Sequence, residues 1–211
     1  SFLGGSPFIW RLDAASSPHD PGRQTGQPAL PADVLTVAPD RADPGHPRAG
    51  GGDAPLYDSF DGGRWTATGS AAPTGSLSIV YFAAVDPHDL DHVVVGMSTT
   101  GVWTTTDSGT TWTQASGLSS TGGPINGFSG VIPTAGSAEV FVMALDIAEA
   151  DAGAPSQGRH IYRSQDGGVS FAPVVDQGGN ITLTNGPLLA AHPTTPGVLY
   201  FTFGSRFLDP P

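Results

Sequence analysis

Four potential metal ligands lie within one short stretch of the chain, namely His88, Asp89, Asp91 and His92. Imidazole nitrogens and carboxylate oxygens are ligands that Zn²⁺ and other transition metals accept. The stretch also lies between two apolar runs, where a polar turn between strands explains its composition. We favour the turn, and we therefore predict neither a metal site nor a cofactor.

The acidic residues suggest a second kind of chemistry, because a glycoside hydrolase needs two carboxylates that face each other across a cleft. The chain has 17 aspartates and two glutamates, so many such pairs can be drawn. Three of the aspartates, Asp61, Asp107 and Asp166, recur in one sequence context, which assigns them to turns instead. The sequence therefore leaves the catalytic residues unknown.

The shared context consists of a hydroxyl residue, an aspartate, a glycine and an aromatic residue. Two copies fit S/T-x-D-x-G-x-x-W/F, and the first copy is one residue shorter. In such a turn the carboxylate can accept unpaired backbone N–H groups, glycine supplies a positive φ, and the buried ring anchors the hairpin. We predict structural turns formed by Ser59, Asp61, Gly63 and Trp65, by Thr105, Asp107, Gly109 and Trp112, and by Ser164, Asp166, Gly168 and Phe171.

Two further markers repeat with the same period as these turns. An apolar–aromatic pair precedes each turn, and a fourth pair lies near the start of the chain. The spacings between the aromatic residues are 47, 46 and 59, for Trp10, Tyr57, Trp103 and Tyr162. Apolar runs that end in proline are spaced by 48, 46 and 60, at Pro39, Pro87, Pro133 and Pro193. The agreement indicates an internal repeat.

Each repeat contains an apolar run, a turn, a second run, a third strand with the aromatic residue, the aspartate turn and an outer strand. Roughly 40 to 50 residues and four strands are the size of a β-propeller blade. We predict an all-β fold of four-stranded antiparallel blades around a channel, with the four aromatic residues packed between blades. The longer third interval is an inserted surface loop at 146–159. Segments 16–31, 45–55 and 119–129 are expected to be loops.

The composition supports this fold and excludes some partners. The chain has 30 glycines, 20 prolines and only 13% charged residues, which is typical of short strands joined by turns. It has no lysine and a net charge of −11, so its surface would repel nucleic acid and anionic membranes. It has no cysteine, so no disulfide can form, and no apolar run is long enough to span a membrane.

The aspartate turns resemble the Asp-box, or bacterial neuraminidase repeat, and the chain is most similar to the xyloglucanase and sortilin-type propellers. The stretch 84–112, from Ala84-Val85-Asp86-Pro87 to Trp112, carries the closest likeness. The resemblance covers residues 5 to about 205 and implies a β-propeller. In these families the Asp-box is structural and lies away from the active centre.

We predict a single β-propeller or propeller fragment over residues 1–211, with about four blades. Complete repeats cover about 33–80, 81–128 and 129–187, and one repeat is divided between 1–32 and 188–211. Strands at 188–191 and 198–203 could pair with a strand at 8–12 and close a four-bladed ring. Alternatively, and in our preferred interpretation, the chain is part of a larger propeller that a missing segment or another protein chain completes. The first residue, Ser1 instead of Met, predicts processing or truncation.

Two departures from the family patterns argue against inherited catalysis. Sialidases carry an Arg-Ile/Leu-Pro signature near the start, which this chain lacks. In xyloglucanases the catalytic base lies in a Thr-Asp-x-Gly-Gly context, and the corresponding stretch 2–6 has the glycines without the aspartate.

The sequence predicts an extracellular propeller module, secreted or at the cell surface, that binds a protein or a polysaccharide within a larger assembly. The alternative is a fragment of a xyloglucanase-like glycoside hydrolase, so enzymatic activity is left open. A purely structural surface protein is a third class.

Overall fold

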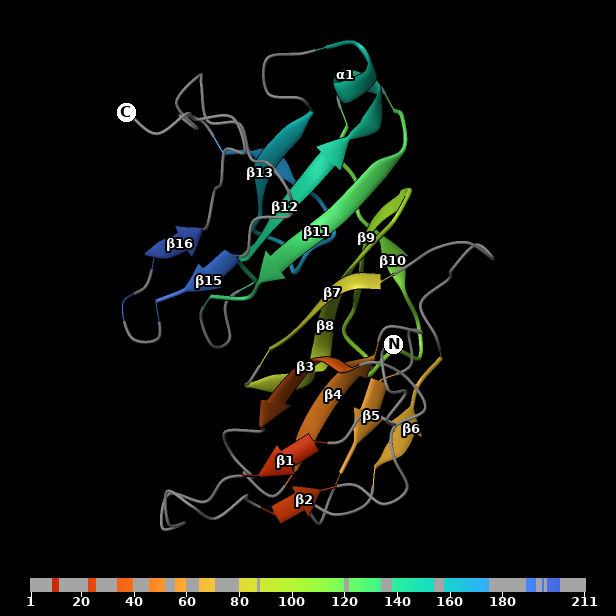
Figure 1. Cartoon of the computed structure of the whole chain (residues 1–211), viewed down its shortest axis with the longest axis vertical. Coiled ribbons are helices and arrows are strands. Elements are labelled where there is room, and N and C mark those ends of the chain that lie inside the picture. Colours follow the sequence, from red (N-terminus) through yellow and green to blue (C-terminus); the bar gives the residue numbers. More distant parts are fainter. Residues whose placement is uncertain are drawn as a thin grey trace, which may run out of the picture.

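The structure is a computed structural model of the whole chain (Figure 1). It describes residues 9–11, 23–25, 34–39, 46–51, 56–59, 65–70, 80–86, 88–119, 122–133, 138–153, 158–174, 189–192, 195 and 197–201.

Almost all the regular structure in these residues is β-strand, which confirms the prediction of a mainly β chain. The first six strands are β1 (Ile9–Arg11), β2 (Arg23–Thr25), β3 (Val34–Pro39), β4 (Pro47–Gly51), β5 (Leu56–Asp58) and β6 (Thr66–Thr68). The next four are β7 (Val80–Asp86), β8 (Asp89–Met97), β9 (Thr100–Thr105) and β10 (Thr113–Gln114). The last six are β11 (Ile125–Val131), β12 (Val140–Asp146), β13 (Arg159–Ser164), β14 (Ala172–Pro173), β15 (Leu189–Ala191) and β16 (Leu199–Phe201).

Strands β3 to β14 form three antiparallel runs of four strands, which we call the first (β3–β6), second (β7–β10) and third (β11–β14) runs. In each run, consecutive strands are paired in chain order. The repeated aromatic residue holds the same register in all three, opposite a small or β-branched residue of the second strand. The pairs are Tyr57 with Ala49, Trp103 with Val95, and Tyr162 with Val142. The period read from the sequence is therefore a period of strand register.

The three runs follow one another along the long axis of the molecule, from orange through yellow-green to teal in Figure 1. Their first strands are neighbours, because β3 contacts β7, β7 contacts β11, and β11 contacts β15. The second and third runs also join into one eight-stranded sheet through a short parallel pairing of β9 with β11. That pairing has only two residue pairs, Ile125 with Thr100 and Asn126 with Gly101.

Two shorter sheets accompany the three runs. Strand β1 pairs with β2, and β15 pairs with β16. Figure 1 places β15 and β16 beside the third run and β1 and β2 beyond the first run. Among the described strands no sheet closes on itself, so the four-bladed ring closed by pairing of β16 with β1 is not found.

Three of the expected loops contain strands. Segment 45–55 contains β4, segment 16–31 contains β2, and β11 begins inside segment 119–129. Glycine and proline in β4 lower its intrinsic strand propensity, but β4 is hydrogen-bonded to β3 on one side and to β5 on the other. Tertiary pairing therefore overrides local propensity here.

The insertion expected at 146–159 contains the short helix α1 (Ile147–Asp151) rather than loop alone. The Asp146 side chain caps this helix by accepting hydrogen bonds from the N–H groups of Ala148 and Glu149. No helix in the described residues has the length and apolar character needed to cross a membrane.

The hydrophobic core lies between adjacent runs. In β8, Val93, Val94 and Val95 are all buried, because the first run lies on one side of this strand and the third run on the other. Val93 and Val95 pack in a cluster with Leu56 of the first run, whereas Val94 packs in a cluster with Val142 of the third run. A continuous apolar stretch is the pattern expected of a strand buried on both faces.

The predicted packing of the repeated aromatic residues between runs is seen for two of them. Trp103 packs, partly buried, against the cluster between the first and second runs, and Tyr162 is buried in the cluster between the second and third runs. Tyr57 is buried instead in a cluster with Ala49 and Trp65 inside the first run. The side chain of Trp10 lies outside the described residues. None of the three described rings forms an exposed platform.

The ring of Phe82 fits between glycines of two neighbouring strands. A Cβ added to Gly96 of β8 would lie 2.0 Å from Phe82 Cε1, and one added to Gly130 of β11 would lie 2.3 Å from Cε2. The ring therefore has backbone on both sides and cannot shift away from either strand. These glycines are required by close packing and not by an unusual φ.

We predict that Gly130→Ala lowers the free energy of unfolding by about 1–3 kcal/mol, because the new methyl group overlaps a ring that has no space to move. Urea unfolding of the purified protein measures this change. In a Phe82→Leu background the same substitution should cost clearly less, because the smaller side chain leaves room. Equal costs in both backgrounds would contradict the packing argument.

Candidate functional site

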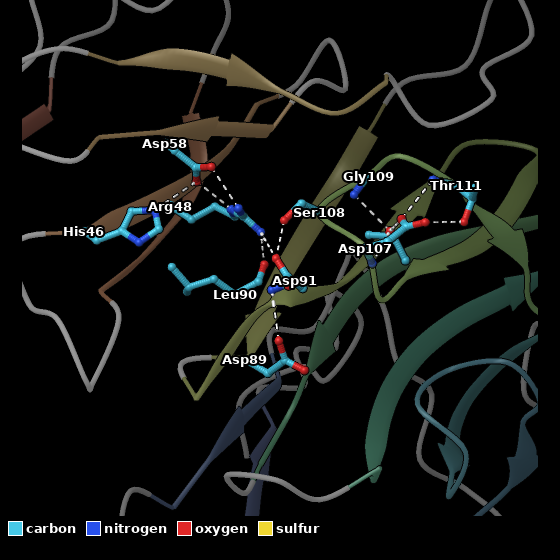
Figure 2. A network of polar contacts seen from close by, with 11 residues as sticks. His46, Arg48, Asp58, Asp89, Leu90, Asp91, Asp107, Ser108, Gly109 and Thr111 are labelled. Atoms are coloured by element: carbon cyan, nitrogen blue, oxygen red, sulfur yellow. Dashed lines mark hydrogen bonds and ion pairs between the residues drawn. The ribbon is translucent and has the colours of Figure 1, made fainter.

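The turn after β9 is held by a closed set of hydrogen bonds around Asp107 (Figure 2). The Thr105 hydroxyl donates to Asp107 Oδ1 at 2.8 Å and accepts the Gly109 N–H at 2.9 Å. Thr111 donates its N–H to Asp107 Oδ1 at 2.8 Å and its hydroxyl to Oδ2 at 2.7 Å. Both carboxylate oxygens therefore bind the turn that carries them.

The turn after β13 repeats this arrangement position by position. The Ser164 hydroxyl donates to Asp166 Oδ1 at 2.7 Å and accepts the Gly168 N–H at 2.9 Å. Ser170 donates its N–H to Oδ1 at 2.9 Å and its hydroxyl to Oδ2 at 2.5 Å. Among the described residues, Asp107 is hydrogen-bonded only within the turn after β9, and Asp166 only within the turn after β13. The two carboxylates therefore do not form one site.

The turn after β5 is described only at its ends. Ser59 and Trp65 are both buried, and the Ser59 N–H donates to the Pro47 carbonyl at 3.1 Å. Asp61 and Gly63 lie outside the described residues. Their role as turn residues stays a prediction.

Hydrogen bonds lower the pKa of both described turn carboxylates. Burial on its own would raise the pKa of Asp166, but hydrogen bonds from Ser170, Ser164 and Val169 outweigh it and hold the pKa at about 2. The pKa of Asp107 is lowered mainly by hydrogen bonds from the Thr111 side chain and backbone, with a further one from Thr105. Both groups therefore remain ionised at neutral pH, as acceptors and not as proton donors.

Each of the two turns docks on the end of the outer strand in the preceding run. After β6, the Ser70 N–H donates to the Gly109 carbonyl at 2.7 Å, and the Trp112 indole N–H donates to the Ser70 carbonyl at 3.0 Å. Gly69 makes this approach possible, because a Cβ there would lie 2.2 Å from the Ser108 carbonyl oxygen.

A related backbone docking joins the second and third runs, through other positions of the turn. After β10, the Ser116 N–H donates to the Val169 carbonyl at 3.0 Å, and the Phe171 N–H donates to the Ser116 carbonyl at 2.9 Å. A Cβ at Gly117 would lie 2.1 Å from the Phe171 carbonyl oxygen. The Gly167 carbonyl also accepts hydrogen bonds from the Thr104 hydroxyl at 2.7 Å and, with Nε2 protonated, from His92 at 2.9 Å.

A buried arginine makes a further link between the first and second runs (Figure 2). Arg48 of β4 donates to both carboxylate oxygens of Asp58, at 2.6 and 2.8 Å, and its remaining nitrogen donates to the Leu90 carbonyl. Arg48 and Asp58 are each 3% exposed. A buried charge of this kind is stable only when it is paired and hydrogen-bonded. The pair is therefore a structural link.

The structure does not gather His88, Asp89, Asp91 and His92 into one metal-binding group. Asp89 Oδ1 accepts the Asp91 N–H, the Asp91 carboxylate accepts the Ser108 hydroxyl, and the His92 ring contacts Gly167 of the third run. Among the described residues, which include all four, no group of three or more histidine or acidic side chains is placed to hold a metal ion. The polar turn predicted here is reduced to His88, because Asp89, Asp91 and His92 already belong to strand β8.

A cavity of about 210 Å³ lies where the β8–β9 turn meets β10 and the segment leading into β11. Thr99, Thr100, Gln114 and Ser119 contribute polar side chains to its lining. None of the described residues that line it is charged or aromatic. It is therefore a neutral, polar site.

The β8–β9 turn beside this cavity is strained. Thr99 has a φ of +61°, which is uncommon for a β-branched residue. Such backbone conformations cost on the order of 1–3 kcal/mol and are frequent at functional sites. The hydroxyl of the next residue, Thr100, is buried and has no hydrogen-bond partner in the described part of the chain.

Sequence reasoning did not find this cavity or the Arg48–Asp58 pair. Arg48 stands in a glycine-rich segment with no motif, and its partners Asp58 and Leu90 are 10 and 42 residues away. Ser98 and Gly101 beside Thr99 indicate a turn, but nothing in the sequence shows that Thr99 itself takes the positive φ. The recurrence of Gly69 and Gly117 after outer strands was the one signal that could have predicted the docking of the turns.

Comparisons with known proteins give a relative of similar sequence. The chain is 41% identical over 207 residues to the dispase autolysis-inducing protein of Streptomyces mobaraensis, covering 97% of this chain and 55% of the relative. It thus spans about half the length of that relative. No protein-family model matches the chain.

Among solved structures, the chain is similar to a GH74 xyloglucanase from Xanthomonas campestris, with a TM-score of 0.57 and 17% identity. This match covers 87% of the chain and 28% of the xyloglucanase. An auxiliary nutrient binding protein from Bacteroides thetaiotaomicron matches with a TM-score of 0.52 and 12% identity, over 82% of the chain and 36% of that protein. At these identities the likeness concerns the fold alone, and it supports a β-propeller of which the chain corresponds to a part.

We predict that Gly117→Ala destabilises the protein by more than about 3 kcal/mol, because the new methyl group overlaps the Phe171 carbonyl oxygen as well as straining a φ of +79°. Gly153→Ala is the matched control, since Gly153 has a similar φ of +73° and no atom within 4 Å of the added Cβ. The control should cost only about 1 kcal/mol. Urea unfolding compares the two, and equal losses would show that the docking contact does not contribute.

The Asp166 turn should make stability depend on acid pH. Because its folded pKa of about 2 lies below the ordinary value of 3.8, its contribution is present above about pH 4 and is lost as pH falls toward 2. The carboxylate is largely exposed, so solvent screening reduces this contribution to about 1 kcal/mol. Urea unfolding of Asp166→Asn should show that loss at pH 6 and almost none at pH 2, with exposed Asp151→Asn as the control. A loss that does not vary with pH would contradict the assignment.

Proposed function

We propose that this chain belongs to an extracellular β-propeller protein that binds another protein, and that its partner is a protease of the dispase type whose autolysis it induces. The observation that carries the proposal is the 41% identity to the dispase autolysis-inducing protein over 97% of the chain. Secretion or exposure at the cell surface is part of the proposal, because a dispase-type protease must be able to meet the protein.

In this proposal the three four-strand runs are propeller blades, and the aspartate turns are Asp-boxes at their corners. The shared hydrogen bonds of the Thr105 and Ser164 turns, and the adjacency of β3, β7, β11 and β15, support that assignment. Repeats at about 33–80, 81–128 and 129–187 are the complete blades. The strand pairs β1–β2 and β15–β16 are parts of blades that a further segment or a partner chain completes.

Binding, and not hydrolysis by this segment, accounts best for the described carboxylates. Asp107 and Asp166 accept hydrogen bonds within their own turns, and Asp58 is bound to Arg48. Asp146 caps α1 and also accepts a hydrogen bond from Ser119. A general acid needs a pKa near the working pH, whereas the two turn aspartates have lowered values.

Glycoside hydrolysis is the second candidate, and the similarity to the xyloglucanase fold is the observation that favours it. A catalytic pair would then lie in a part of the protein beyond the described residues. Release of reducing sugar from xyloglucan and other β-glucans by the full-length protein would support this candidate. Absence of release from all of them would exclude it.

We predict that the full-length protein, added to purified dispase, accelerates the loss of intact dispase in a saturable manner. Electrophoresis over time should show defined dispase fragments that are absent without the added protein. Dispase whose active site is blocked by a tight inhibitor is the control, and it should stay intact because the cleavage is its own. Fragmentation of blocked dispase, or no acceleration at any concentration, would contradict the proposed function.

A further inference from the structure

Three independent features meet at the β8–β9 turn. The cavity lies there, Thr99 has a strained φ of +61°, and the hydroxyl of Thr100 is buried without a partner among the described residues. A buried polar group without a hydrogen bond is costly, and backbone strain concentrates at functional sites.

The polar groups around the cavity are held in place by other residues. Gln114 donates from Nε2 to the Thr100 carbonyl at 2.8 Å. The Ser119 hydroxyl donates to Asp146 Oδ2 at 2.7 Å and accepts the Gly123 N–H at 3.2 Å. Asp146 is fully buried and is itself fixed as the cap of α1. Groups fixed in this way lose little conformational entropy when a ligand binds.

The size and charge of the cavity restrict what it can bind. Its volume of about 210 Å³ is smaller than the roughly 300–1,000 Å³ of a pocket that encloses a whole small molecule. It therefore fits a part of a larger partner. The chain has a net charge of −11, yet no charged residue is among those that line the cavity, so the bound part is uncharged.

We propose that this cavity is the point at which an uncharged, extended polypeptide segment of the protease partner binds. This inference rests on the proposed function, which supplies a protein as the partner. Four of the lining residues are glycines, Gly101, Gly117, Gly122 and Gly123, which leave the Gln114 side chain accessible. Among the described residues this side chain makes one hydrogen bond, to the Thr100 carbonyl, so its amide oxygen and second N–H remain for a ligand. The N–H and C=O groups of an extended backbone match this acceptor and donor.

A polysaccharide fits the cavity less well. The apolar face of a sugar ring packs well on a flat aromatic side chain, and none lines this cavity in the described residues. The aromatic residues Tyr57, Trp103 and Tyr162 pack in the hydrophobic clusters instead. Binding of xyloglucan oligosaccharide is therefore the outcome that the experiment must separate from binding of protein.

The test uses the full-length protein and two variants. Gln114→Trp fills the cavity from an exposed strand position that favours aromatic residues. Thr113→Trp, on the opposite face of the same strand and not in the lining, is its matched control. Each variant is compared with the unmodified protein in thermal melting, in the dispase autolysis assay and in binding to inhibitor-blocked dispase.

We expect Gln114→Trp to weaken apparent affinity for blocked dispase by about tenfold or more, and Thr113→Trp to leave it within about twofold. Hydrogen exchange measured by mass spectrometry should show that blocked dispase protects residues 113–119 and 122–125. Xyloglucan oligosaccharide should not protect them.

The other results overturn the inference in distinguishable ways. Suppose that the protein induces autolysis, but that Gln114→Trp and Thr113→Trp bind blocked dispase with equal affinity, or that dispase protects other segments from hydrogen exchange. The proposed binding site is then wrong, and the proposed function stands. If dispase protects the segment but no autolysis follows, the site stands and the proposed function falls. If neither autolysis nor protection is seen, both fall. If xyloglucan oligosaccharide protects residues 113–119 and 122–125 and blocked dispase does not, the cavity is a sugar-binding site.

Discussion

The close backbone contact between each aspartate turn and the outer strand before it is the constraint on which the arrangement of the runs depends. At both described junctions main chain meets main chain, through Ser70 and Gly109 in one and through Ser116 and Phe171 in the other. Such backbone contacts do not depend on the core side chains, so runs with different cores can be joined by docking of this kind. They do require glycine, because a Cβ at Gly69 or Gly117 would overlap a carbonyl oxygen of the next turn.

This constraint also determines what the recurring carboxylates can do. Asp107 and Asp166 shape the turns that dock, and hydrogen bonds keep them charged. A residue that every repeat needs for its own geometry is a poor candidate for chemistry that happens once per molecule. Function is therefore expected where the repeats differ from one another, as they do at the helix α1.

The sequence predicts those parts of the structure that arise from short-range, repeated interactions. Asp107 and Thr111 are four residues apart, and the same spacing recurs at Asp166 and Ser170, so the turns can be read from the chain. The strand β4 could not, because its two glycines and its proline indicate a loop and only pairing with β3 and β5 makes it a strand. The cavity was also missed, since it depends on Thr100, Gln114 and Ser119 coming together from three segments.

The position of the cavity follows from how the second and third runs are joined. Their shared sheet holds only two parallel residue pairs, at Thr100 and Gly101, so the strands separate immediately beside the β8–β9 turn. Ser119 bridges this opening to Asp146, and Asp146 at the same time caps α1. The insertion that lengthens the third repeat is thereby tied through one buried carboxylate to the lining of the cavity. An element that breaks the repeat thus helps to fix the polar groups that the repeat alone would leave unsupported.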